Sequence, residues 1–384
     1  MGTPVRYHGG MRSLCLLSFF AACSPSDVDV TDTDGSPDVD PAACHTVPMS
    51  PVAPRHLVVA QPYNADFSQS QLWHVFQVLA DGELARTDTF EMGRAFSGAV
   101  RFTPDGQIGA VPQDDGTIGL FSLDAKGIAT VISAGFGEGA VYASEVRFAP
   151  DAETLYAVDG NWVNNGGGIY AISVDCDGQL GVPMRILEAK LPGGLTWDEG
   201  PERAVLFSIE VDGAPETTLH TADLTLGTWL DHALAFVDGA GQPSEIVITD
   251  NYLVVGDTDE FAGHGGRVAS LTWPDLLPVA EARFRDPVSL LNVEGDRVLC
   301  SMGYADAVIE LAPDATHIGD RGHVSAQLPG TLTMLRSGAL ASWAWVGTVD
   351  GVMPMSLGEG MRVYPAIAVG PPEARQGGAI GVQP

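Results

Sequence analysis

Short hydrophobic runs, separated by turns rich in glycine, proline and aspartate, recur along most of this chain. Seven of these runs share a pattern and follow one another at a nearly constant interval. They are Ala99–Phe102, Glu145–Phe148, Gly194–Trp197, Glu245–Ile248, Ser289–Asn292, Thr331–Met334 and Ala379–Val382. Their second residues stand at positions 100, 146, 195, 246, 290, 332 and 380, so the steps run from 42 to 51. A period of about 40–50 residues with four strands per repeat is typical of β-propeller blades.

Inside each repeat, the turn chemistry and the apolar runs indicate four strands. The segment Val100–Phe102 runs into Pro104-Asp105-Gly106, where proline presets the backbone angle φ and glycine accepts a positive one. Further strands are expected at Ile108–Val111, Ile118–Leu123, Thr154–Val158 and Ile169–Val174. The expected second strands of later repeats are Arg203–Ser208, Tyr252–Gly256, Arg297–Met302 and Ala339–Ala344. No window of the sequence has the pattern of a long amphipathic helix, so the predicted fold class is all-β.

The strand and turn at Val100–Gly106 resemble the Val-x-Phe-x-Pro-Asp-Gly repeat of the lactonase/YncE-like seven-bladed β-propellers. The resemblance covers residues 54–384 and implies one domain of seven antiparallel four-stranded blades. It says little about activity, because this superfamily includes enzymes, binding proteins and scaffolds. Phe102, Phe148 and Trp197 of the inner strands are expected to pack in the core.

Ring closure is predicted from the two ends of the repeat region. The residues before the first complete repeat match only a second, third and fourth strand, at His56–Ala60, Leu72–Val78 and Thr87–Met92. The last residues, Gly378–Pro384, match the start of a repeat at Gly98–Pro104. We therefore expect residues 379–382 to supply the inner strand of the N-terminal blade, which would leave no open sheet edge.

The chain is strongly acidic, with 49 Asp and Glu against 19 Lys and Arg and a net charge of −30. Binding to nucleic acid depends on basic residues that displace counterions, so DNA and RNA are excluded as partners. No motif marks a nucleotide or haem site. The nucleophile elbow Gly-x-Ser-x-Gly and the zinc motif His-Glu-x-x-His do not occur in the sequence.

Residues 1–22 resemble a bacterial lipoprotein signal peptide. Two arginines precede a short apolar run, Leu14–Ala22, which is too short to span a bilayer as a helix. The run ends in Phe20-Ala21-Ala22-Cys23, which resembles a lipobox, although that family prefers leucine where Phe20 stands. The resemblance implies lipidation of Cys23 and, because Ser24 follows it, the outer membrane of a Gram-negative bacterium. An ordinary secretory signal is the alternative, and either Met1 or Met11 could be the start.

Residues 23–53 are expected to form an acidic, disordered tether between the lipid and the propeller. Residues 24–40 hold six aspartates and no basic residue, and like charges keep such a segment extended. The aspartate spacing resembles that of calcium loops, but the required glutamate and the helical frame are missing.

Three cysteines remain once Cys15 leaves with the signal and Cys23 takes lipid. Cys300 lies in a predicted buried strand and is expected to be an inert thiol. Cys44 and Cys176 lie in predicted exposed segments of an exported chain, so a disulfide between them is possible and would fix the end of the tether to one blade.

Ligands of propellers usually bind on the face that carries the loops between second and third strands. Blade three has a long loop, residues 159–168, in which Asn161, Trp162 and Asn164 could contact a sugar ring or a peptide. Alternatively, the loop is a glycine-rich turn whose tryptophan caps the neighbouring blade. The sequence leaves both interpretations open.

The matching loop of blade five, residues 257–266, contains Asp257, Asp259 and His264. These side chains could hold a cation or provide a general base, or they are merely solvated. No cofactor is otherwise expected, but Asp159 and Asp257 would suit Ca²⁺ if both faced the central channel.

Other residues are expected on the same face or at the channel mouth. They are Glu145, Glu245, Tyr304 and Asp306, together with Gln113, Asp114, Asp115, Glu210 and Asp350. Lactonase-type propellers use acidic residues with histidine or arginine around the channel. That pattern does not map onto this chain residue by residue, so no catalytic residue is assigned.

Three functions remain open, of which the third is a purely structural partner in an envelope complex. The main hypothesis is a non-enzymatic binding or scaffolding module anchored to the envelope through its lipid, with a protein, peptide or glycan partner. The alternative is a lactonase-like or other hydrolase with an acidic central channel that could bind calcium. The absence of a catalytic constellation favours the first, and the resemblance favours the second.

Overall fold

The chain divides into two compact units, Met1–Val39 and Asp40–Pro384. The computed structural model describes residues of the second unit only: 44–160, 166–189, 192–197, 204–210, 217–223, 228–234, 243–257, 266–285, 288–292, 297–302, 307–326, 329–335, 338, 340–358 and 360–384. Within these residues every regular element is a β-strand. The described part of the chain therefore contains no helix that could cross a membrane.

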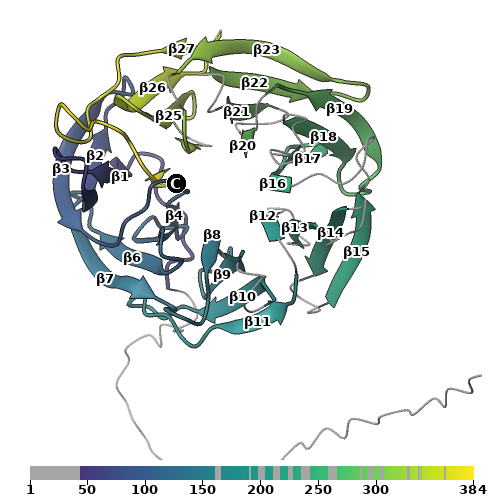
Figure 1. Ribbon diagram of the computed structural model, residues 1–384, viewed down its shortest axis with the longest axis horizontal. Coiled ribbons are helices and arrows are strands. Elements are labelled where there is room, and N and C mark those ends of the chain that lie inside the picture. The colour runs from purple at the N-terminus through teal and green to yellow at the C-terminus, as the bar shows by residue number, and fades with distance from the viewer. Residues whose placement is uncertain are drawn as a thin grey trace, which may run out of the picture. The chain divides into compact units, whose positions relative to one another are not determined.

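The strands form seven four-stranded antiparallel sheets within the described part of the chain, arranged as the blades of a ring (Figure 1). The all-β propeller fold is therefore confirmed. The first blade contains β28 (Ile380–Val382), β1 (Arg55–Tyr63), β2 (Gln69–Val78) and β3 (Leu84–Glu91). The second contains β4 (Arg101–Phe102), β5 (Ile108–Pro112), β6 (Ile118–Leu123) and β7 (Ala129–Phe136). The third contains β8 (Ala143–Phe148), β9 (Thr154–Asp159), β10 (Gly168–Ser173) and β11 (Met184–Leu187).

The remaining blades repeat this order. The fourth contains β12 (Pro192–Trp197), β13 (Ala204–Glu210), β14 (Thr217–Asp223) and β15 (Thr228–Leu234). The fifth contains β16 (Pro243–Ile248), β17 (Tyr252–Asp257), β18 (Arg267–Thr272) and β19 (Pro278–Arg283). The sixth contains β20 (Ser289–Asn292), β21 (Val298–Met302), β22 (Ala307–Pro313) and β23 (Ile318–Ser325). The seventh contains β24 (Leu332–Met334), β25 (Trp343–Thr348), β26 (Gly351–Ser356) and β27 (Arg362–Val363).

The predicted segments overlap these strands, with one clear correction. The prediction placed a second strand at Ala339–Ala344, but β25 begins at Trp343. Residues 340–342 form a turn in which the Trp343 N–H donates to the Leu340 carbonyl at 3.0 Å. The strand starts at the partly buried Trp343 and continues into Ala344, Trp345 and Val346, which are completely buried.

The first blade is closed by the C-terminal strand, as expected. Strand β28 pairs with β1 in the register Leu57↔Val382, Val58↔Gly381 and Val59↔Ile380. The same segment contacts the second blade through an isolated parallel bridge between Ala99 and Ile380. The last residues of the chain therefore join the first blade to the second.

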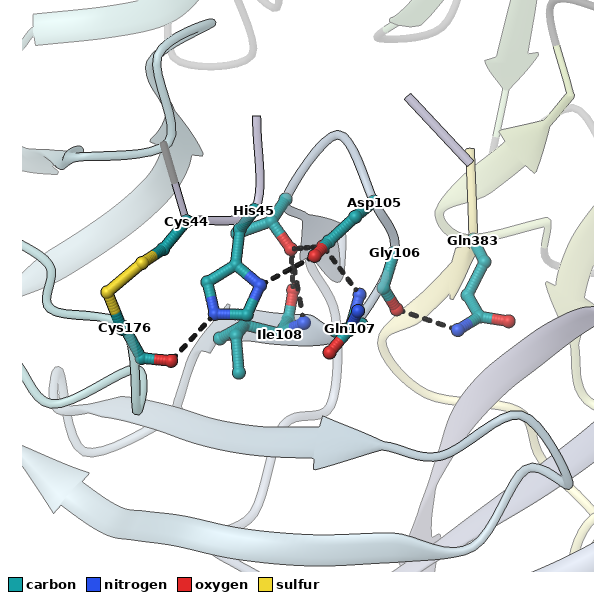
Figure 2. A network of polar contacts seen from close by, with 9 residues as sticks. Cys44, His45, Asp105, Gly106, Gln107, Ile108, Cys176 and Gln383 are labelled. Carbon is teal, nitrogen blue, oxygen red and sulfur yellow. Dashed lines mark hydrogen bonds and ion pairs between the residues drawn. A yellow bond between two sulfur atoms is a disulfide. The ribbon is translucent and has the colours of Figure 1, made fainter. Parts of the chain in front are cut away.

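A segment at the start of the described chain, Cys44–Pro54, lies along the turn side of the propeller and is called the strap below. Cys44 is joined to Cys176 by a disulfide, and the Met49 N–H donates to the Pro104 carbonyl at 2.9 Å. The expected tether is therefore fixed to the propeller from Cys44 onward (Figure 2).

The side chain of His45 connects the strap to two blades. Its Nδ1 lies 2.6 Å from the Asp105 carboxylate and its Nε2 lies 2.9 Å from the Cys176 carbonyl (Figure 2). Both partners accept hydrogen bonds, so this geometry favours the doubly protonated ring, in which both nitrogens donate. Burial acts to lower the pKa of His45, but these hydrogen bonds and the nearby carboxylates outweigh it, and the pKa is raised.

The core lies between neighbouring blades. Val146 and Phe148 of β8 pack with Ile108 and Ala110 of the second blade. Phe102 meets Phe121 edge-on at 5.9 Å, and Trp197 meets Tyr156 at 5.2 Å, so the expected packing role of these aromatic residues is confirmed. Cys300 is a free and completely buried thiol, and burial raises its pKa.

Candidate functional site

Three charged side chains meet where the inner strands of the second and third blades lie next to each other (Figure 1). Because Val146 and Phe148 enter the core, alternation along β8 directs Glu145 and Arg147 to its opposite face. Arg101 of β4 reaches the same place. These three residues are called the inner-strand cluster below.

One carboxylate oxygen of Glu145 lies between two guanidiniums. Its Oε1 is 3.3 Å from Nε of Arg147 and 3.6 Å from Nη2 of Arg101. The side chains of Glu145, Arg147 and Arg101 are 20%, 15% and 27% exposed, so each remains in partial contact with solvent. The cluster sets two guanidiniums beside one carboxylate, and guanidiniums are suited to a ligand with a carboxylate or a polarised carbonyl.

The cluster combines a possible base with two cationic hydrogen-bond donors. A carboxylate can accept a proton from water, and guanidiniums can stabilise negative charge that develops on an oxygen. One base and two cationic donors are the types of group that can hydrolyse an activated carbonyl group without a metal ion.

The structure places the other predicted residues apart from this cluster. Asp159 is the last residue of β9, pairs with Ala143 and Gly168, and is completely buried. Glu245 lies on β16 and is partly buried, and its charge contributes to the raised pKa of Cys300. Asp257 ends β17, but its side chain lies outside the described part. Eight further predicted residues lie outside the described residues: Cys23, Asn161, Trp162, Asn164, Asp259, His264, Tyr304 and Asp306.

Among the described residues, no three His, Cys, Asp or Glu side chains gather in a way that could hold a metal ion. Calcium between Asp159 and Asp257 therefore stays a prediction. Of the predicted site residues, Glu145 belongs to the inner-strand cluster, whereas Gln113, Asp114 and Asp115 line a separate polar cavity.

Sequence reasoning missed Arg101 and Arg147. The signal was present, because both arginines occupy the same position of the inner-strand repeat, between the two apolar residues of Val100-Arg101-Phe102 and Val146-Arg147-Phe148. When the inner strands of two adjacent blades both carry arginine at this position, their positive charges lie close together. A carboxylate such as Glu145 is then the expected partner.

The comparisons with known proteins identify the fold. No protein-family model and no curated protein matches the sequence. The structure is similar to a periplasmic gluconolactonase from Pseudomonas aeruginosa, with a TM-score of 0.64, 12% identity, and coverage of 86% of this chain and 99% of that chain. It is also similar to a candidate 6-phosphogluconolactonase from Bacteroides uniformis, with a TM-score of 0.63, 10% identity, and coverage of 86% and 99%.

A third similar structure is AztD from Citrobacter koseri, with a TM-score of 0.51, 10% identity, and coverage of 86% of this chain and 98% of that chain. Identities this low establish shared architecture and carry no residue roles. The chain is thus an all-β propeller of the architecture found in lactonase-like proteins.

Proposed function

We propose that this protein is an exported hydrolase that opens a sugar lactone at the inner-strand cluster. The observation that carries the proposal is Glu145 held by Arg101 and Arg147 on adjoining inner strands. Two proteins of similar architecture are described as a gluconolactonase and a candidate 6-phosphogluconolactonase, and this supports the choice of substrate class.

The reaction follows from the three side chains. Glu145 accepts a proton from water as the water oxygen attacks the lactone carbonyl carbon. The guanidiniums of Arg101 and Arg147 stabilise the oxyanion that forms on the carbonyl oxygen. The bond between the carbonyl carbon and the ring oxygen then breaks, and the ring oxygen takes up the proton and leaves as a hydroxyl. The product is a hydroxy acid whose carboxylate can pair with the arginines.

The test is hydrolysis of glucono-1,5-lactone by the purified chain, measured above the spontaneous rate. We expect Glu145→Gln to lower kcat/KM at least 100-fold, since a positioned base contributes about 10²–10⁴ to such a rate. Glu153→Gln changes an exposed glutamate of the same blade and should leave the rate unchanged. A wild-type rate equal to the background, or a Glu145→Gln variant as fast as wild type, would disprove the proposal.

The same assay distinguishes the other hypothesis, a non-enzymatic binding or scaffolding module of the envelope. That module would show no turnover with any lactone, and its partner would be a protein, a peptide or a glycan.

Export and anchoring are part of the proposal. The Cys44–Cys176 disulfide supports an oxidising compartment, and the lipobox-like residues before Cys23 support a lipid anchor, which we place at the outer membrane. Labelling cells with a radioactive fatty acid should mark the wild-type protein and leave the Cys23→Ala variant unlabelled. Label on both would show that Cys23 is not the attachment point.

A further inference from the structure

A polar cavity of about 540 Å³ lies between the first and second blades, away from the inner-strand cluster. Its lining comes from the start of β2, the segment after β3, the loop between β5 and β6, and β7. The lining residues are Gln69, Gln71, Glu91, Met92, Gly93, Arg94, Gln113, Asp114, Asp115 and Ala134. The volume falls within the range of about 300–1,000 Å³ that is usual for small-molecule sites.

The floor of this cavity contains an unsatisfied polar group. Gln113 is only 5% exposed, and its side-chain nitrogen has no hydrogen-bond partner among the described residues. Its side-chain oxygen lies 2.9 Å from Oγ1 of Thr117. A buried amide that lacks one partner costs about 1–3 kcal/mol, so a ligand that supplies the partner is favoured.

Two glycines make room for this amide. A Cβ atom on Gly93 would lie 1.8 Å from Oε1 of Gln113, and one on Gly119 would lie 2.3 Å from its Nε2. No larger residue fits at either position while the Gln113 side chain stays in place. The Gln113 amide therefore occupies space between the blades that these two glycines leave open.

The charges around the cavity limit what can bind there. Arg94 is paired with Asp114, and the second oxygen of Asp114 accepts the Phe96 N–H at 2.8 Å. This leaves Glu91 and Asp115 as the charges that no arginine of the lining offsets, so an anionic ligand is disfavoured.

The Gln113 amide limits the ligand further. The Thr117 hydroxyl also lies 2.7 Å from the Asp115 carboxylate, and a hydroxyl donates only one proton. Whichever way the Gln113 amide is turned, one of its polar atoms is left without a partner. A free amide nitrogen needs an acceptor and a free amide oxygen needs a donor. An alcohol hydroxyl supplies either one, whereas a metal ion or an ammonium group supplies no acceptor.

We propose that this cavity binds a neutral polyhydroxylated molecule of hexose size, with one hydroxyl on the Gln113 amide. Gln69, Gln71 and Glu91 at the exposed rim hydrogen-bond the remaining hydroxyls. This site is independent of the proposed hydrolysis at the inner-strand cluster, because it uses different residues and does not need catalysis.

The test is saturation-transfer difference NMR on the full chain with D-glucose, D-galactose and D-mannose. We expect saturable transfer from at least one hexose, with affinity lowered at least tenfold in the double variant Gln71→Ala/Glu91→Ala. The matched control Gln179→Ala/Glu83→Ala changes exposed residues outside the cavity and should bind like wild type. Gln113→Leu should also lose binding. If that buried change prevents folding, the exposed double variant Gln71→Ala/Glu91→Ala, called the rim variant below, still tests the site.

Any one of three results would overturn the proposal. The first is no saturation transfer from any of the three hexoses, and the second is equal hexose affinity in the rim variant and wild type. The third is displacement of the hexose by Ca²⁺ at matched ionic strength. Loss of binding in Glu145→Gln with retention in the rim variant would place the hexose at the inner-strand cluster instead. Failure of the lactonase assay leaves this outcome unaffected, because no step of the NMR experiment requires turnover.

Discussion

The side-chain oxygen of Gln383 accepts a hydrogen bond from the backbone N–H of His56 at 3.0 Å, across 327 positions of the sequence. The same oxygen lies 2.9 Å from Nδ1 of His56. The side-chain nitrogen of Gln383 donates to the Gly106 carbonyl at 2.7 Å (Figure 2). One buried amide therefore ties the first strand of the ring to the turn of the second blade.

Removal of the closing strand should abolish the folded state. Deletion of residues 377–384 removes β28 and exposes the edge of β1, and exposed edges pair with other chains. We expect aggregation or loss of the cooperative melting transition, measured by circular dichroism and light scattering. Deletion of the exposed Pro384 alone is the control and should have little effect. A soluble, cooperatively melting 377–384 deletion would contradict the closure.

A single methyl group at the closure should also destabilise the ring. A Cβ atom on Gly381 would lie 2.2 Å from the carbonyl oxygen of Val100 and 2.6 Å from its Cβ. Gly381→Ala must push β28 away from the second blade, at a cost of about 1–3 kcal/mol in the free energy of unfolding. Gly358→Ala serves as the control, because no atom of the described residues lies within 4 Å of its added Cβ. Equal urea midpoints for the two variants would show that β28 can shift to accommodate the methyl group without a loss of stability.

The disulfide should stabilise the propeller mainly by restricting the unfolded chain. It links residues 132 positions apart, and a closed loop of that size is worth up to about 5 kcal/mol. The double variant Cys44→Ser/Cys176→Ser should melt at a lower temperature than wild type. Cys300→Ser changes the third cysteine of the propeller and should leave the disulfide intact in non-reducing mass analysis. Thiol labelling of Cys44 or Cys176 in unreduced wild type would count against this bond.

Acid should destabilise the first blade through His74. Burial, together with the nearby charge of Arg86, lowers the pKa of His74 from 6.5 to about 4. Between those values the unfolded chain binds a proton that the folded chain does not, so stability falls as pH falls from about 6.5 to about 4. The shift corresponds to about 3 kcal/mol.

His74→Gln should flatten this part of the stability curve in denaturant titrations at pH 7, 5.5 and 4.5. His56, whose pKa is also lowered by burial, still contributes a slope of the same sign in that variant. An imidazole NMR signal showing His74 protonated at pH 5.5 in the folded protein would rule out the effect.

The strap should respond to pH in the opposite direction. The pKa of His45 is raised in the folded state. The stabilisation that protonated His45 gives the strap is therefore complete below 6.5, the pKa in the unfolded chain, and is lost as pH rises through the folded pKa. We expect proteolysis near residues 44–54 to be faster at pH 9 than at pH 6. His45→Gln should remove that difference, and an unchanged pH dependence in the variant would assign it to other groups.

Much of the architecture could be predicted from the sequence because each blade repeats the same local chemistry. The inner strand β8 carries Val146 and Phe148 at alternate positions, and β16 carries the consecutive apolar residues Ile246, Val247 and Ile248. Boundaries were less accurate where polar residues extend a strand. β2 begins at Gln69 rather than Leu72, because its backbone ladder continues past the apolar run.

The candidate sites were less predictable, because they depend on contacts between blades. Glu145 was singled out from its own strand, but its partner Arg101 lies 44 positions earlier, on the neighbouring blade. Likewise Gln113 and Asp114 were expected on the loop face, while Arg94 and Gln71 were not. Their meeting depends on the packing of two blades, which the sequence pattern of a single repeat does not encode.

The strap determines how the molecule would be presented at a surface. Strand β5 runs from the Asp105 turn, where the strap is attached, to the Gln113 loop, where the hexose-sized cavity opens, so these two features lie at opposite ends of the blade. Under the proposed anchoring at Cys23, the chain coming from the lipid would reach the propeller at the Cys44–Cys176 disulfide. A pull on that anchor would then load the turn end of the blade and leave the lining of the cavity under no direct tension.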